Sequence, residues 1–240
     1  ASLTAYDGTR LEARNLIGSF NPEQTRRVLL FAHWDCRPYS DHDSDAANHR
    51  KPVDGADDGA SGVGVLLEIA RQLGQKAPQV GVDILFCDAE DYGTPEFVDS
   101  YKPDTWCLGT QFWVKNPHVK GYKAEFGILL DMVGGRNATF FREFQSQRAA
   151  APILEMVWSK ARDLGYGKYF INAEGGAITD DHQYVISGLR IPSIDIINYD
   201  PDSKTGFAPY WHTQKDNMDN IDRETLKAVG ETVLAVIYNQ

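Results

Sequence analysis

Short apolar segments alternate along this chain with segments of helical periodicity, and this alternation constrains the fold more than any other feature. Runs rich in β-branched and aromatic residues predict strands. Several of these runs are almost continuously apolar, as expected for strands buried on both faces of a parallel sheet. The pattern therefore predicts an α/β fold: a three-layer α/β/α sandwich around a mixed, largely parallel sheet. Strands are expected at 11–20, 28–32, 82–86, 126–131, 169–172 and 191–197, and helices at 62–73, 149–164 and 223–238.

The length and charge of the chain exclude several classes of protein. With 240 residues, 42% of them hydrophobic, and no internal repeats, residues 1–240 are expected to form one domain. A net charge of -10 with scattered basic residues argues against a nucleic-acid partner. No apolar run of about 18 residues is present to span a membrane. The three cysteines lack metal-finger spacing and are expected to be small buried hydrophobes: Cys36, Cys87 and Cys107.

Acids and histidines follow the predicted strands at the points where the strands end. The carboxyl ends of parallel strands meet at one edge of a sheet, where binding sites collect. Carboxylates gathered there repel one another unless a cation lies among them. Carboxylates together with neutral imidazole suit zinc, so a zinc site is expected at this edge. The residues concerned are His33, Asp35, Asp57, Asp58, Asp88, Glu90, Asp91, Asp131, Asp180, Asp181, His182 and His212.

Two neighbouring acids, Glu90 and Asp91, follow the predicted strand 82–86. Successive residues of a strand point to opposite faces, so both acids reach one site only if the backbone bends sharply. Gly93 is expected to permit that bend. One acid would then bind metal while the other moves protons. The alternative is that the acidic pair caps the element that follows.

Structural roles are also open to individual members of the set. Asp58 is suited to cap the helix that begins near Ser61. His33 is compatible with a hydrogen-bonded core histidine, and Asp180 to His182 with a helix cap followed by an exposed histidine. Asp131, at the end of a buried strand, requires a partner because an unpaired buried carboxylate is costly. His212, in a polar segment, is the hardest to explain without a site.

The order of these motifs resembles the zinc-dependent aminopeptidase superfamily M28. Within it, the chain is most similar to the type II, animal-type glutaminyl-peptide cyclotransferases and their bacterial relatives. The resemblance extends from about Leu11 to the C-terminus. The motifs that carry it are His33-x-Asp35, Gly55-Ala56-x-Asp58-x-x-Ser61-Gly62, Glu90-Asp91, Leu129 to Gly134, Asp180-Asp181-His182, Gly188 to Pro192 and Trp211-His212-Thr213.

The resemblance implies a role for each matching residue. One catalytic zinc would be held by Asp58, Asp91 and His212, with Glu90 as proton shuttle. It also implies a zinc-exopeptidase-like fold and a cis peptide bond between Asp58 and Gly59. The other implied roles are a hydrogen-bond network with Glu90 for Asp131 and Asp180, a pocket wall for Phe207 and Trp211, and a second-metal or supporting position for His33.

The resemblance further implies cyclisation of N-terminal glutamine of peptides to pyroglutamate, with release of ammonia. Relatives work outside the cytoplasm, so a removed leader and an extracytoplasmic location are expected, although the residues are also compatible with a cytoplasmic one. A monomer is favoured. The resemblance implies three departures: Asp91 stands where most members have Glu, Asp195 stands where animal enzymes have histidine, and the sequence begins almost at the first expected strand, before which the family usually carries a helical segment. A trimmed or a minimal N-terminus is expected.

Two alternatives remain open. A dizinc aminopeptidase would use nearly the same ligands, with Asp58 bridging two zinc ions and Glu90 activating a water. A non-catalytic receptor-type domain of the superfamily would keep the fold and lose the site. All of the residues that the site needs are present, which disfavours the receptor-type domain. Ligand identity alone does not separate the cyclase from the peptidase.

Overall fold

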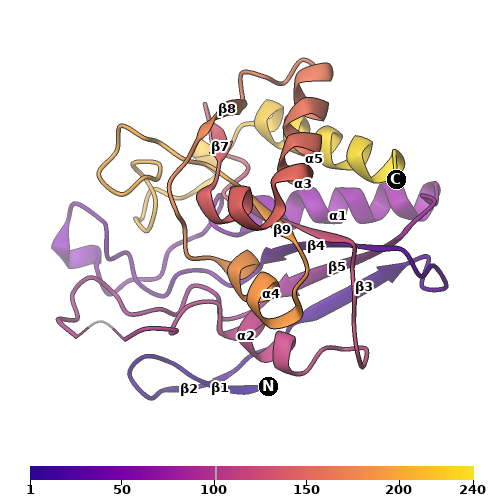
Figure 1. Cartoon of the computed structure of the whole chain (residues 1–240). Coiled ribbons are helices and arrows are strands. Elements are labelled where there is room, and N and C mark those ends of the chain that lie inside the picture. Colours follow the sequence, from indigo (N-terminus) through magenta and orange to yellow (C-terminus); the bar gives the residue numbers. More distant parts are fainter. Residues whose placement is uncertain (101) are drawn as a thin grey trace.

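A five-stranded sheet lies at the centre of the computed structural model, which describes residues 1–100 and 102–240 (Figure 1). The strand order is β3-β5-β4-β6-β9. β3 pairs antiparallel with β5, and the other neighbouring strands are parallel. The prediction of a mixed, largely parallel sheet is therefore confirmed. The strands are β3 (Leu16–Phe20), β4 (Arg27–His33), β5 (Gly81–Cys87), β6 (Phe126–Asp131) and β9 (Ser193–Ile197).

Helices cover both faces of this sheet. Figure 1 shows α1, α3 and α5 on one face, and α2 and α4 on the other. Within the described residues, no helix has the length and apolar character needed to cross a membrane. The helices are α1 (Ala60–Gln75), α2 (Leu108–Lys115), α3 (Phe144–Asp163), α4 (Asp181–Leu189) and α5 (Arg223–Tyr238). Smaller elements are the antiparallel pair β1 (Ser2–Thr4) and β2 (Arg10–Glu12), the parallel pair β7 (Phe140–Arg142) and β8 (Phe170–Glu174), and the short helices η1 (Ala46–Asn48) and η2 (Met218–Asn220).

The apolar strands bury both of their faces because alternate side chains point in opposite directions. In β4, Leu30 belongs to the larger core cluster, which includes residues of α1, α3 and α5. Its neighbours Leu29 and Phe31 belong to a second cluster, which includes Trp113 of α2 and Val185 of α4. A continuous apolar run thus serves two cores, as the sequence pattern predicted.

The elements differ from the sequence predictions in several places. The expected strand 11–20 is two strands, β2 and β3, separated by a short connection. The helix expected at 149 begins at Phe144, because the Glu143 side chain accepts hydrogen bonds from the backbone N–H groups of Gln145 and Ser146. α2 and α4 were not predicted, because helices of eight and nine residues display little periodicity.

Asp83, on the buried strand β5, is the most heavily hydrogen-bonded carboxylate of the sheet. It accepts from Ser19 Oγ at 2.6 Å, from Tyr122 Oη at 2.8 Å and from the Arg27 guanidinium at 2.7 Å, which joins β3, β4 and the segment before β6. Its side chain is 1% exposed, so the ion pair with Arg27 is shielded from solvent.

We expect Asp83→Asn to lower the free energy of unfolding by about 3 kcal/mol, because the change leaves the half-buried Arg27 charge without the buried carboxylate that pairs with it. Urea denaturation followed by circular dichroism would measure this loss. Glu68→Gln removes the exposed pair with Arg71 and serves as the control, with no measurable change expected. Equal effects of the two substitutions would contradict the assignment of Asp83 as a buried structural anchor.

Candidate active site

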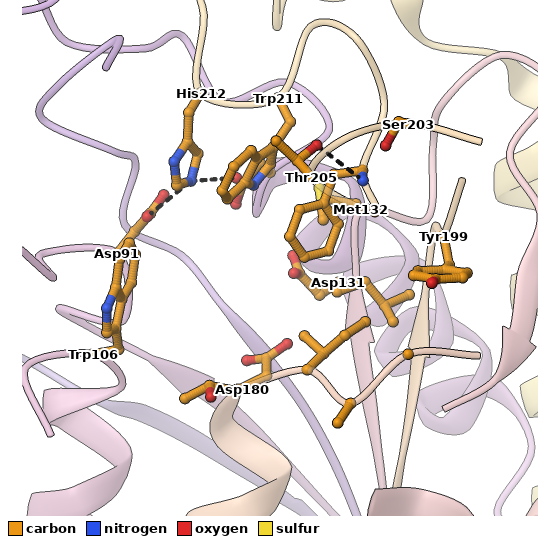
Figure 2. Close-up of a pocket in the computed structure, with 18 of the residues that line it drawn as sticks. Asp91, Trp106, Asp131, Met132, Asp180, Tyr199, Ser203, Thr205, Trp211 and His212 are labelled. Atoms are coloured by element: carbon orange, nitrogen blue, oxygen red, sulfur yellow. Dashed lines mark hydrogen bonds and ion pairs between the residues drawn. The ribbon is translucent and has the colours of Figure 1, made fainter. Parts of the chain in front are cut away.

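The carboxyl ends of the parallel strands border a cavity of about 480 Å³. Figure 2 shows His212 and Trp211 on one side of this cavity, Asp91 and Trp106 on another, and Asp131 and Asp180 at its base. Eight of the nine residues proposed from the sequence line it: Asp58, Glu90, Asp91, Asp131, Asp180, Phe207, Trp211 and His212. The ninth, His33, is buried beside the cavity and contacts Asp58 and Asp131.

Glu90 and Asp91 both reach the cavity because the backbone turns just before them. Ala89 has a φ of 53°, in the left-handed region. The Asp35 carboxylate then accepts the backbone N–H groups of Glu90 and Asp91, each at 3.0 Å. Gly93 was expected to provide the bend, which is wrong: a Cβ there would lie 2.0 Å from the Trp106 ring, so Gly93 allows close packing instead.

His212 faces two carboxylates at distances suited to a shared metal ion. Its Nε2 atom lies 3.3 Å from Asp91 Oδ1 and 3.4 Å from Asp58 Oδ2. Zinc bonds of 2.0–2.1 Å in a tetrahedron place neighbouring ligand atoms about 3.3 Å apart. Both Asp91 oxygens are buried without a hydrogen-bond partner. The three side chains therefore fit a zinc ion, with Asp91 reaching the centre despite its short side chain.

The electrostatics of the three side chains also favour a cation. Burial by itself lowers the pKa of His212, but the charges of Asp91 and Asp58 outweigh burial and raise it to about 9. Burial likewise opposes the ionisation of Asp58, yet its contacts with His212 and His33 hold the pKa of Asp58 below its usual value. The same negative field that attracts a proton to the imidazole attracts a divalent ion.

Asp58 is held at the site by the backbone around it. The carboxylate of Asp216 accepts the N–H of Asp57 at 2.8 Å and that of Asp58 at 3.1 Å. The Asp58–Gly59 peptide bond is cis, as the resemblance implied. The alternative of a helix cap is wrong for Asp58, because Gly59 occupies the N-cap position of α1 and no side chain caps that helix.

His33 lies close to two carboxylates of the site. Its Nε2 atom lies 3.0 Å from Asp58 Oδ1 and 3.1 Å from Asp131 Oδ1, and the contact with Asp131 is a hydrogen bond. These three side chains are also close enough together to hold a metal ion. Asp58 thus directs one oxygen to His33 and the other to His212.

The sequence did not reveal the groups that support His212. Asp41 Oδ1 lies 3.6 Å from His212 Nδ1, the nitrogen that faces away from Asp58 and Asp91. The buried Arg37 guanidinium binds both Asp41 oxygens, at 3.2 and 2.7 Å, and donates to the Asp91 carbonyl at 2.8 Å. Such a carboxylate behind a ligating histidine orients its ring. In the sequence, only the i,i+4 spacing of Arg37 and Asp41 could have indicated that these two side chains form an ion pair.

Glu90 lies in an environment that favours its protonated form. Burial, followed by the charges of Asp91 and Asp180, raises the pKa of Glu90 well above its usual value. Burial also raises the pKa of Asp131 to about 6 and that of Asp180 well above its usual value. Each of these three carboxyl groups therefore binds a proton more readily than an exposed carboxyl group does.

Cys107 touches this acid cluster, which the sequence analysis did not anticipate. Its thiol donates to Glu90 Oε1 at 3.2 Å. The expectation of buried cysteines is confirmed for Cys87 and Cys107 and wrong for Cys36, which is exposed. His182 is likewise buried, so the prediction of an exposed histidine there is wrong, whereas Asp180 does cap α4 by accepting the N–H of Asp181.

Aromatic side chains close one wall of the cavity. The rings of Phe207 and Trp211 lie with their centroids 4.6 Å apart, and Trp211 stacks on His212 at 3.7 Å. The Trp106 ring is also stacked with the His212 ring, with the two centroids 6.1 Å apart. Figure 2 shows both side chains at the cavity. The wall can bury the apolar part of a side chain that reaches the metal position.

Comparisons with known proteins agree with this geometry. The profile of peptidase family M28 matches residues 15–237. A Zn-dependent exopeptidase from Parabacteroides distasonis is 80% identical, with a TM-score of 0.99, and the match covers all of this chain and 82% of that one. The glutaminyl cyclase of Tannerella forsythia is 73% identical, with a TM-score of 0.98 and the same coverage.

A more distant relative is the glutaminyl-peptide cyclotransferase of Bos taurus. It is 28% identical over 243 residues, and the match covers 88% of this chain. The chain spans 62% of the length of that relative. The chain thus resembles both a protein described as an exopeptidase and proteins described as glutaminyl cyclases or cyclotransferases.

Proposed function

Because this chain belongs to peptidase family M28, we propose that it is a zinc-dependent glutaminyl-peptide cyclotransferase, an acyltransferase that converts N-terminal glutamine of peptides to pyroglutamate and releases ammonia. The observation that carries the proposal is that a set of possible zinc ligands, Asp58, Asp91 and His212, lines one cavity together with Glu90. His212 Nε2 lies 3.4 Å from Asp58 and 3.3 Å from Asp91. The 73% identity to the Tannerella forsythia glutaminyl cyclase supports the same proposal.

Each residue of the cavity has a task in this reaction. A zinc ion held by Asp58, Asp91 and His212 would supply a Lewis acid for the γ-carbonyl of the glutamine. Trp211 and Phe207 enclose the glutamine side chain and limit the access of water. Glu90 accepts a proton from the α-amine as its nitrogen bonds to the γ-carbonyl carbon. Glu90 then donates that proton to the amide nitrogen, which leaves as ammonia.

The closest alternative function is a dizinc aminopeptidase. It requires a second ion among His33, Asp58 and Asp131, which lie close enough together to hold one, and a nucleophilic water beside Glu90. In the proposed cyclase, His33 Nε2 instead hydrogen-bonds to Asp131, and we propose one zinc ion per chain. A receptor-type domain is disfavoured, since the ligand set and Glu90 lie together in one cavity.

We expect the purified protein to release ammonia from Gln-naphthylamide and to leave Leu-nitroanilide intact, with one zinc per chain by plasma emission spectrometry. His33→Asn is expected to keep the zinc content at one, because His33 acts as a hydrogen-bond donor to Asp58 and Asp131. Hydrolysis of Leu-nitroanilide with two zinc ions per chain, one of them lost in His33→Asn, would favour the aminopeptidase.

The proposal extends to the setting of the reaction. The substrates are peptides and proteins with N-terminal glutamine, and the negative net charge of -10 would attract their positively charged N-termini. We keep the predictions of an extracytoplasmic location, of one catalytic domain over residues 1–240, and of a monomer. Size-exclusion chromatography with light scattering would measure the oligomeric state.

A further inference from the structure

A second group of buried polar side chains lies behind Asp180, outside the cavity. Glu143 precedes α3, His182 lies in the first turn of α4, and Asp195 lies at the centre of β9. Their exposed fractions are 1%, 0% and 0%. None of the three has a part in the chemistry proposed above. Buried charged groups of this kind require a reason, since each is costly to remove from water.

The contact between Glu143 and His182 defines which ring nitrogen carries a hydrogen. The Glu143 carboxylate accepts the backbone N–H groups of Gln145, Ser146 and Ile178. Burial opposes its ionisation, but its hydrogen bonds, first that with His182, lower the pKa of Glu143 to about 2. Glu143 is therefore an acceptor, and His182 Nε2, at 3.2 Å, is the donor.

The other ring nitrogen of His182 faces Asp195. His182 Nδ1 lies 3.7 Å from Asp195 Oδ2. Neither Asp195 oxygen has a hydrogen-bond partner, and the same holds for His182 Nδ1 and Asp180 Oδ2. Asp180, His182 and Asp195 each offer an atom within 4.8 Å of the other two. Buried polar atoms without a hydrogen-bond partner are thus gathered on three neighbouring side chains.

A proton between the carboxyl groups of Asp180 and Asp195 gives their oxygens a hydrogen bond and avoids two neighbouring negative charges. Asp195 is surrounded by Asp180, Asp131 and Glu143, and the only ion-pair contact recorded for it in the described residues is with His182. A second ionised carboxylate beside Asp180 would face like charge without solvent. Burial, followed by the charges of Asp180 and Asp131, raises the pKa of Asp195 well above its usual value.

Asp180 connects this group to the reaction. Glu90, Cys107 and Asp180 also offer atoms within 4.8 Å of one another. One Asp180 oxygen accepts the N–H of Asp181, and the other, Oδ2, is the unpartnered one. When Glu90 holds the proton taken from the substrate amine, its hydroxyl needs a nearby acceptor that does not itself take the proton. An Asp180 carboxylate that already receives a hydrogen bond is such an acceptor.

We propose that Asp195 is a positioning residue that keeps a proton during turnover and donates it in a hydrogen bond to Asp180, with its orientation set by the Glu143–His182 pair. Asp180 is thereby kept as an acceptor for the protonated Glu90. The effect on turnover rests on the proposed cyclase function, whereas the protonation of Asp195 does not.

Infrared difference spectroscopy tests the protonation directly. Subtracting the spectrum of Asp195→Asn from that of the native protein at pH 8 is expected to show the carbonyl stretch of a protonated carboxylic acid. Asp83→Asn is the matched control: Asp83 is as deeply buried but paired with Arg27, so its difference spectrum is expected to show carboxylate bands. Carboxylate bands in the Asp195 difference spectrum would overturn the proposal.

Kinetics test the link to the reaction. Asp195→Ala is expected to lower kcat by about 10- to 100-fold with KM nearly unchanged, because Asp195 lies outside the cavity that receives substrate. Asp195→Asn, a neutral donor of the same shape, is expected to restore most of the lost kcat. An Asn variant as slow as the Ala variant would mean that Asp195 must ionise, which would overturn the proposal.

Metal analysis tests whether a cation, rather than a proton, lies among Asp180, His182 and Asp195. A cation bound by Asp180, His182 and Asp195 would lower the metal content of Asp195→Asn by one ion per chain relative to the native protein, and that result would also overturn the proposal. If the proposed cyclase function is wrong, the result is different: the native protein would not convert Gln-naphthylamide, while the infrared band assigned to Asp195 would still be present.

Discussion

Glu90→Gln is expected to lower kcat for cyclisation of Gln-naphthylamide by about 10²- to 10⁴-fold, the range by which positioned acid–base groups contribute. The amide keeps the size of the side chain but cannot accept the amine proton. KM should change little, and zinc should remain bound, because the three proposed ligands are untouched. Steady-state kinetics together with metal analysis of the same preparation would measure both quantities.

The control for this variant is Glu96→Gln, which alters an acid on the same connection whose side chain is 69% exposed. It should leave kcat unchanged. A zinc-loaded Glu90→Gln enzyme with native kcat would contradict the shuttle role, and Asp131 or Asp180 would then have to carry the proton. Loss of zinc in Glu90→Gln would instead indicate that Glu90 is itself a ligand.

His212→Ala is expected to remove the zinc and to lower kcat/KM by about 10³-fold or more. The variant leaves two carboxylates, Asp58 and Asp91, without the nitrogen ligand that completes the set. The magnitude corresponds to the several kcal/mol of charge stabilisation that a bound Lewis acid supplies. Plasma emission spectrometry and the Gln-naphthylamide assay would measure the two losses.

Thermal unfolding tests the role of His212 in zinc binding without an activity assay. Zinc stabilises a protein that binds it in the folded state, so a chelator should lower the Tm of the native protein and not that of His212→Ala. The control is His118→Ala, because His118 follows α2 and does not line the cavity. The Tm of this variant should fall with chelator as that of the native protein does. A His212→Ala protein that retains one zinc would show that the ion lies elsewhere.

The layers of the fold were predictable because the inner strands of the sheet are short and largely apolar on both faces. Residues 28–32 and 82–86 had no plausible position except between two layers of helices. The helices with a long apolar face, α1 and α5, were predicted almost to their ends. α2 and α4 were missed because eight or nine residues display too few turns for periodicity to stand out.

The members of the candidate site could be proposed from their positions at strand ends and from the family resemblance. Their arrangement could not. Which of Glu90 and Asp91 faces His212 depends on the left-handed turn at Ala89 and on the Asp35 carboxylate that holds both backbone N–H groups. The support of His212 by Arg37 and Asp41, and the contact of Cys107 with Glu90, join segments that are distant along the chain.

The sequence by itself determined the layer order of this protein and the chemistry available to it, because periodicity and side-chain type are properties of local segments. Only the tertiary structure decided that His33 lies between Asp58 and Asp131 while His212 faces Asp58 and Asp91, and that His182 is buried against Glu143 and Asp195. The physical reason is that these contacts, and the loss of solvent around them, arise only when distant segments pack together.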